Sequence, residues 1–221
     1  MRKMVAATFV SLDGVMQAPG GPEEDPTGGF ALGGWTFPYF DDTMGQRLGE
    51  VFSVPFELLL GRKTYEIFAA HWPYVPEDDP IGKVFNATRK YVVTSSREPL
   101  AWQNSTAIRG DAAAELARLK QQDGPMLLLQ GSSELIQTLL SRGLIDEFRL
   151  MIFPLVLGRG KRLFGTGAVP MALRLIDAKM STTGVAMHTY VPAGEVRTGS
   201  FAAEQPSAAE IARRKRMAAE G

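Results

Sequence analysis

The chain has 221 residues, of which 45% are hydrophobic and 22% charged, and its 24 basic and 24 acidic residues cancel to zero net charge. This composition is typical of one globular domain with a full core, and the balanced charge argues against nucleic acid or an acidic membrane surface as the main partner. The absence of cysteine excludes disulfides and thiolate chemistry. With only two histidines, His71 and His188, no metal centre is expected.

The N-terminal segment predicts a first strand over residues 4–12. Its basic start precedes an apolar run that Thr8 and Ser11 interrupt, so it does not read as a signal peptide. No stretch of the chain reaches the ~20 apolar residues of a membrane span. We therefore expect a cytoplasmic protein without a membrane partner.

Residues 17–38 form a long segment rich in glycine and proline that also carries several aromatic residues. Loops of this length inside a compact domain are usually functional or disordered. We expect this one to cover a pocket, with Trp35 and Phe37 shielding a flat substrate from water. The alternative is that Trp35 packs in the core or in a subunit interface.

Helical and strand patterns alternate along the rest of the body. Apolar periodicity predicts helices over 41–54, 65–70, 81–88, 112–122 and 134–141, and strands over 57–60, 90–94, 126–129, 147–153, 172–179 and 185–191. The alternation predicts an α/β fold with a mostly parallel sheet, and the two last strands predict an antiparallel pair at its edge.

The composition changes near the C-terminus. Residues 1–192 read as the folded domain, and residues 193–221 as a polar tail that is partly helical or disordered. The basic run 213–216 fits either a nucleic-acid or partner contact or a solvated basic helix, and we favour the solvated helix.

Three polar turns, over 61–64, 94–97 and 130–133, each follow a predicted parallel strand. Such strand ends share one edge of a sheet, and ligands bind there. Glycines and helix starts favour anions, although Ser132 or Ser133 could instead be a simple helix cap. With Arg62, Lys63 and Arg97 nearby, the three turns suit a ligand such as NADP, which carries phosphates at more than one point.

Several segments of the chain carry a family resemblance: VAATFVSLDGVM, ELLLGRKTYEIF, RKYVVTSS and MLLLQGSSELIQTLLSRGLIDEFRLMIFPLVLGRGKRLF. Over about residues 4–192 the chain resembles the dihydrofolate-reductase-like superfamily, specifically the reductase (C-terminal) domain of the riboflavin-biosynthesis protein RibD. The resemblance implies the three-layer dihydrofolate-reductase-like fold, a homodimer, and NADPH-dependent hydride transfer. The implied substrate is a pyrimidine- or pterin-like heterocycle, as in 5-amino-6-(5-phosphoribosylamino)uracil reductase or dihydrofolate reductase.

The resemblance also implies roles for the three turns. The cofactor residues that it implies are Gly61, Arg62 and Thr64 for the phosphates; Thr94, Ser95, Ser96 and Arg97 near the adenosine 2′-phosphate; and Gln130, Gly131, Ser132 and Ser133 for the pyrophosphate.

Candidate residues for the chemistry lie near the start of the chain. Asp13 matches a polar residue that faces the nicotinamide and is our candidate proton donor, with an ordinary Asp-Gly turn as the equal alternative. Asp41 and Asp42 are further acid candidates, and we expect Asp41, Trp35 and Phe37 to contact substrate.

Three functional hypotheses follow. The main one is an NADPH-dependent reductase of a small heterocycle; the alternative is a non-catalytic nucleotide-binding or interaction protein that retains the fold. A flavin-using reductase is weaker, because cationic turns suit a 2′-phosphate. The zinc deaminase that accompanies some relatives is excluded, since it needs a Pro-Cys-x-x-Cys motif and this chain has no cysteine.

Overall fold

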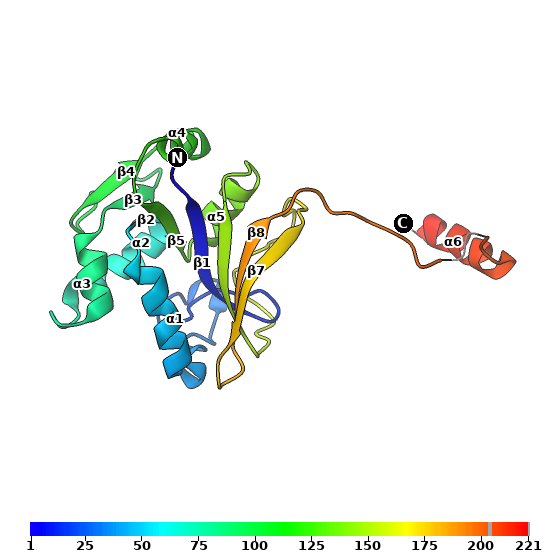
Figure 1. The fold of residues 1–221 in the computed structure, drawn as a ribbon, viewed down its shortest axis with the longest axis horizontal. Helices are drawn as coiled ribbons and strands as arrows, with labels where there is room; N and C mark the ends of the chain where they lie inside the picture. The colour runs from blue at the N-terminus through cyan, green and yellow to red at the C-terminus, as the bar shows by residue number, and fades with distance from the viewer. Residues whose placement is uncertain (203–204, 221) are drawn as a thin grey trace.

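The computed structural model describes residues 1–202 and 205–220, and its centre is one sheet of eight strands (Figure 1). The strands are β1 (Met4–Ser11), β2 (Phe56–Gly61), β3 (Lys90–Val93), β4 (Ser105–Ile108), β5 (Met126–Gln130), β6 (Glu147–Phe153), β7 (Leu173–Met180) and β8 (Ala186–Pro192). Their order is β4-β3-β2-β5-β1-β6-β8-β7, with parallel neighbours from β4 to β6 and antiparallel pairing of β8 with β6 and β7.

Helices cover both faces of the sheet, which gives three layers. The helices of the body are α1 (Asp42–Ser53), α2 (Arg62–Ala69), α3 (Pro80–Ala87), α4 (Ala112–Gln121) and α5 (Ser133–Leu140), with single 3-10 turns η1 (Thr27–Gly29), η2 (Phe37–Tyr39) and η3 (Trp72–Tyr74). Apolar side chains of α4 and α5 share one core cluster, and those of α1, α2 and α3 share the clusters on the opposite face.

The central strand β5 shows why its sequence is almost wholly apolar. Leu127 and Leu129 belong to the core cluster beneath α4 and α5, whereas Leu128 belongs to the cluster beneath α1, α2 and α3. All three side chains are fully buried. A parallel strand covered on both faces needs apolar residues at every position, not at alternate ones.

The sheet opens beside β1. β1 pairs with β5 only as far as Ala7 and Gln130, but it continues beside β6 as far as Ser11 and Phe153. The chain turns into α5 soon after Gln130, so from Thr8 onward β1 lies beside β6 alone in the described structure. This opening is at the carboxyl edge of the parallel strands, where ligands bind in open α/β sheets.

The structure confirms the predicted α/β class, the mostly parallel sheet and the antiparallel closing strands. Element bounds agree to within a few residues, except that α2 begins at Arg62, because the predicted turn 61–64 is already its first turn. Strand β4 was missed. Ser105–Ile108 is short, carries two hydroxyl residues and has no fully buried side chain, so it lacks the apolar pattern of the other parallel strands.

The C-terminal tail extends away from the body. After β8 the chain runs out to α6 (Ala208–Glu220), which lies apart from the sheet and its helices (Figure 1). No residue of α6 is buried. Glu210 pairs with Arg213 and Arg214 inside the helix, which gives local support of the kind that stabilises solvated helices.

We predict that a chain ending at Glu195 keeps the stability of the full protein. Ala172 exchanges backbone hydrogen bonds with Ala193 and Gly194, so the shortened chain retains the last contact of the tail with the sheet. The melting temperature should change by less than about 2 °C, which corresponds to less than about 1 kcal/mol. Calorimetry of both chains measures this, and a larger fall would show that residues 196–221 pack on the body or on another copy.

Candidate functional site

A large cavity lies at the opening beside β1. Its volume is about 1770 Å³, and it is bordered by β1, α1, α2, the start of α5 and residues 16–25. Pockets that hold one drug-sized ligand have volumes of roughly 300–1,000 Å³. This cavity is therefore larger than one drug-sized ligand requires.

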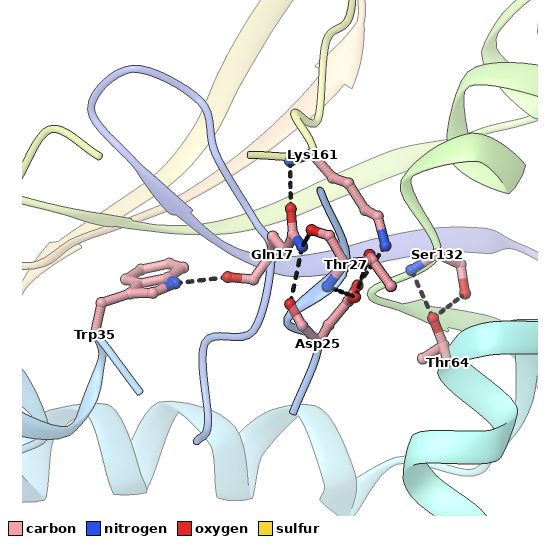
Figure 2. A network of polar contacts seen from close by, with 7 residues as sticks. All are labelled: Gln17, Asp25, Thr27, Trp35, Thr64, Ser132 and Lys161. Carbon is pink, nitrogen blue, oxygen red and sulfur yellow. Dashed lines mark hydrogen bonds and ion pairs between the residues drawn. The ribbon is translucent and has the colours of Figure 1, made fainter. Parts of the chain in front are cut away.

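Two of the predicted turns are locked together at the middle of the cavity. The Ser132 backbone N–H and its hydroxyl both donate to Thr64 Oγ1, at 3.0 and 2.9 Å, and Figure 2 shows this pair. Ser132 Oγ in turn accepts from the backbone N–H of Gly61 at 2.9 Å. These three bonds fix the N-terminus of α2 against the N-terminus of α5.

Gly131 makes this close approach possible. Its φ is +66°, in the left-handed region, and a Cβ there would lie 3.1 Å from Thr64 Cγ2. Ser132 is also left-handed, with φ of +57°, so the chain turns sharply from β5 into α5. Glycine at position 131 lets the two turns meet without a side chain between them.

Helices α2 and α5 lack side-chain caps, unlike α1, α3 and α4. Asp41, Asp79 and Asp111 cap α1, α3 and α4, each accepting from backbone N–H groups of the first turn. Gly61 and Ser132 hold the corresponding positions of α2 and α5, and neither caps its helix through a side chain. The simple helix-cap role considered for Ser132 is therefore wrong.

Two uncapped helix starts border the cavity. The first N–H groups of a helix have no partner within the helix, and they carry the positive end of its dipole. Because the starts of α2 and α5 both line this cavity, their free N–H groups are available there to an anionic group.

The third predicted turn forms one end of the cavity. Thr94, Ser95 and Ser96 line it, and the Ser96 backbone N–H donates to Thr94 Oγ1 at 3.0 Å. Arg62 also lines the cavity and donates to the backbone carbonyl of Glu98 at 3.2 Å, so its guanidinium lies between the two turns. Arg97 is exposed and does not line the cavity, which separates it from the other predicted cofactor residues.

The opposite part of the cavity, beneath α1, has an apolar wall bordered by two arginines. Arg149 of β6 lies in register between Ala7 of β1 and Thr189 of β8. Arg47 reaches in from α1, donates to Thr189 Oγ1 at 3.2 Å and pairs with Asp177. The apolar lining here is Leu48, Val51, Met151 and Met187.

The segment after β1 is a fixed wall whose centre is the buried side chain of Gln17 (Figure 2). Its Nε2 donates to the carbonyls of Asp25 and Thr27, both at 2.9 Å, and its Oε1 accepts from the Lys161 backbone N–H at 3.0 Å. The Lys161 ammonium also pairs with the Asp25 carboxylate. These contacts join residues 17–27 to the segment that follows β6.

The expected roles of Trp35 and Phe37 as a cover over the substrate are not supported by their positions. Trp35 is buried in the core, where its ring packs edge-on against Phe153 at 5.1 Å and its Nε1 donates to the Gln17 carbonyl at 2.8 Å. Phe37 is 84% exposed. Neither residue lines the cavity, so this expectation is corrected: Trp35 is a core residue, which was the alternative considered.

Asp13 also lies outside the cavity lining, which corrects its placement as the proton donor. Its carboxylate accepts from the Ser11 hydroxyl at 2.6 Å and from the backbone N–H groups of Leu157 and Gly158 at 3.0 and 2.9 Å. The bond from Ser11, with help from these N–H groups, lowers the pKa of Asp13 to about 2. Asp13 is therefore ionised at neutral pH and holds a turn together.

Asp41 is likewise structural, and Asp42 does not line the cavity either. Besides capping α1, the Asp41 carboxylate accepts from the Thr182 hydroxyl at 2.7 Å and from the Thr182 backbone N–H at 2.8 Å. The bond from the Thr182 hydroxyl, followed by that from the Met44 N–H, lowers the pKa of Asp41. Neither acid is placed to contact a ligand in the cavity.

Sequence reasoning missed many polar residues that line the cavity. Six of these missed residues are Gln17, Glu24, Asp25, Arg47, Arg149 and Lys161. They come from a loop, a helix, a strand and a second loop, and no local motif connects them. The pairing of β1 with β6, and of β6 with β8, brings the loop, α1 and β6 together.

Within residues 1–202 and 205–220, no three His, Cys, Asp or Glu side chains gather closely enough to bind a metal ion. In the same residues no helix has the length and apolar content needed to cross a membrane.

Comparison with protein families identifies the chain. The RibD C-terminal domain family matches residues 2–189, which include every element of the cavity. The chain belongs to this family. A relative from Bacillus subtilis (strain 168), the uncharacterized protein YyaP, is 30% identical over 136 residues, which are 60% of this chain and 72% of the relative.

Solved structures confirm the fold of this RibD C-terminal domain protein. One is a diaminohydroxyphosphoribosylaminopyrimidine deaminase/5-amino-6-(5-phosphoribosylamino)uracil reductase from Thermotoga maritima, with a TM-score of 0.57, 17% identity, and coverage of 87% of this chain and 57% of that one. Another is dihydrofolate reductase from Enterococcus faecalis complexed with NADP(H), with a TM-score of 0.52, 14% identity, and coverage of 86% and 96%. The fold is therefore dihydrofolate-reductase-like, as expected.

We predict that Trp35→Ala destabilises the domain by about 3–5 kcal/mol, because it removes a large buried ring from the core. Phe37→Ala is the matched control; it removes an exposed aromatic ring from the same loop and should change stability by less than about 0.5 kcal/mol. Urea unfolding of both variants measures the difference. Equal stability of the two variants would mean that the Trp35 ring contributes nothing to the core.

Proposed function

We propose that this RibD C-terminal domain protein is an NADPH-dependent reductase that transfers hydride to a C=N or C=O bond of a pyrimidine- or pterin-like heterocycle. The observation that carries the proposal is the pair of uncapped helix starts, α2 and α5, locked together by Ser132 and Thr64. A diphosphate bridge is the ligand group that such a pair suits best.

The residues present fit the whole cofactor. The pyrophosphate would lie against Thr64, Gly131 and Ser133, where Gly131 leaves room for a close approach. The adenosine end would lie along Thr94–Ser96, with Arg62 beside it for a 2′-phosphate. When bound there, NADPH supplies the hydride, while the protein orients the reactants and excludes water.

The substrate end of the cavity supports a flat, oxygen-bearing ring. Leu48, Val51 and Met151 offer apolar contact for the faces of a heterocycle, and the guanidinium groups of Arg47 and Arg149 can only donate hydrogen bonds. They therefore suit a ring edge that carries carbonyl oxygens. The descriptions of the Thermotoga and Enterococcus proteins name reductases of a uracil and of dihydrofolate, which are heterocycles of this kind.

The alternative is a non-catalytic nucleotide-binding protein that retains the fold. Such a protein needs only the phosphate end of the cavity, and the developed substrate end favours the reductase. Calorimetric titration with NADPH, NADH and FMN distinguishes the reductase from the non-catalytic nucleotide-binding protein. Tenfold tighter binding of NADPH than of NADH, about 1.4 kcal/mol, supports the reductase; a failure to bind any of the three compounds contradicts the proposed function.

We predict that Arg62→Ala weakens NADPH binding at least about tenfold and NADH binding less than about threefold, because a charge-assisted bond to the 2′-phosphate is lost. Arg97→Ala is the matched control and should change neither affinity, since Arg97 is exposed outside the cavity. Calorimetric titration of each variant with both cofactors measures this. Equal losses for both cofactors in Arg62→Ala would remove Arg62 from the 2′-phosphate site.

We also propose that the protein is a homodimer that uses the edge strand β7. Every residue of β7 after Leu173 is exposed, including the apolar Leu175, Ile176 and Met180. An apolar edge of this kind pairs readily with another chain. Sedimentation analysis should give a dimer for the native protein and a monomer for Ile176→Glu; a native monomer at micromolar concentration would contradict the proposal.

A further inference from the structure

The orientation of the cofactor in the cavity determines which residues can deliver a proton to the substrate. Under the proposed function, a dinucleotide would place its phosphates at the starts of α2 and α5 and its adenosine end along Thr94–Ser96. Its other end would then lie against the remaining lining, which includes Ala7 and Thr8 of β1 and residues 17–25. Under the proposed function hydride transfer takes place at this second end, so the proton donor must come from its walls.

Several titratable groups that line the cavity already have partners. Asp25 is paired with Lys161 and also accepts from the Thr27 hydroxyl. Burial opposes its ionised form, but the bonds from Lys161 and Thr27 outweigh this and lower the pKa of Asp25. Arg47 and Arg149 are paired with Asp177 and Glu147. His188 of β8 is hydrogen-bonded through Nδ1 to the Tyr190 hydroxyl at 2.8 Å.

Glu24, unlike its neighbour Asp25, forms no ion pair with the described residues, and its pKa is raised and not lowered. Its Oε2 accepts from the backbone N–H groups of Gly20 and Gly21, at 2.6 and 3.2 Å, which hold the side chain in place. Among the described residues none donates to Oε1, and the side chain carries no ion pair. Glu24 is half-buried and lines the cavity.

We infer that Glu24 is the proton donor of the reaction, an assignment that rests on the proposed function. As hydride from NADPH forms the new C–H bond, the π electrons of the C=N or C=O bond move to the nitrogen or oxygen. The Glu24 carboxyl gives its proton to that atom, and water then reprotonates the Glu24 carboxylate. Overall, one NADPH and one proton reduce one double bond.

The charges around Glu24 agree with this role. Burial raises the pKa of Glu24 and the adjacent Asp25 carboxylate adds to the rise, while the Gly20 and Gly21 N–H groups and His71, at the end of α2, oppose it. Two neighbouring carboxyl groups whose pKa values are moved apart are a recurring arrangement of acid catalysis. Because the protonated form is active, turnover should fall as the pH rises through the Glu24 pKa.

Glu24→Gln tests the inference. The amide oxygen can still accept from Gly20 and Gly21, and it removes the cost of burying a charge, so the melting temperature should not fall at neutral pH. With dihydrofolate and 5-amino-6-(5-phosphoribosylamino)uracil as the probe substrates, kcat should fall about 100-fold or more, with the NADPH affinity unchanged. The fall of kcat with rising pH should also disappear. Glu77→Gln, which removes an exposed glutamate charge outside the cavity, should retain the native pH profile.

A second measurement is independent of turnover. In the protein labelled with ¹³C at the glutamate carboxyl carbons, the resonance missing from Glu24→Gln should titrate above the ordinary glutamate pKa, both with and without NADP⁺. An ordinary pKa, or native kcat and pH profile in Glu24→Gln, would overturn the assignment. A protein that does not bind NADPH at all would instead overturn the proposed function, and calorimetry detects this separately.

Discussion

The cavity depends on the bond network that joins Gly61, Thr64 and Ser132. These residues come from two turns separated by about a third of the chain, and both ends of the network are backbone groups at the start of a helix. Because side chains are used to hold the turns together, the helix starts themselves stay available to a ligand. Three hydrogen bonds therefore hold the start of α2 against the start of α5.

A second set of contacts shapes the substrate end. Gln17 ties the loop after β1 to the segment after β6, and the Asp25–Lys161 ion pair strengthens the connection. The loop is therefore a wall with defined positions for its side chains. Glu24 depends on this wall, since its own contacts are with Gly20 and Gly21 of the same loop.

The fold and the turns at residues 61–64 and 130–133 could be predicted from the sequence because their signals are local. The apolar run of β5 and the glycine of Gly131 indicate a buried strand and a tight turn within a few residues. The substrate end could not be predicted in this way. Trp35 lies in a loop whose composition is typical of a pocket cover, but its ring packs against Phe153 in the core. Arg149 becomes a cavity residue only through the register of β6 with β1.

The missing cap on α2 has a consequence for stability. Gly61 has φ of −76°, which any residue adopts, and a Cβ there would come no closer than 3.5 Å to its neighbours. The backbone thus tolerates Asp at position 61, and a capping side chain typically adds about 0.5–2 kcal/mol to stability. A carboxylate in that place would compete with a bound phosphate for the same N–H groups. The native chain is therefore less stable than its fold allows, and under the proposed function a bound phosphate would take the place of the missing cap.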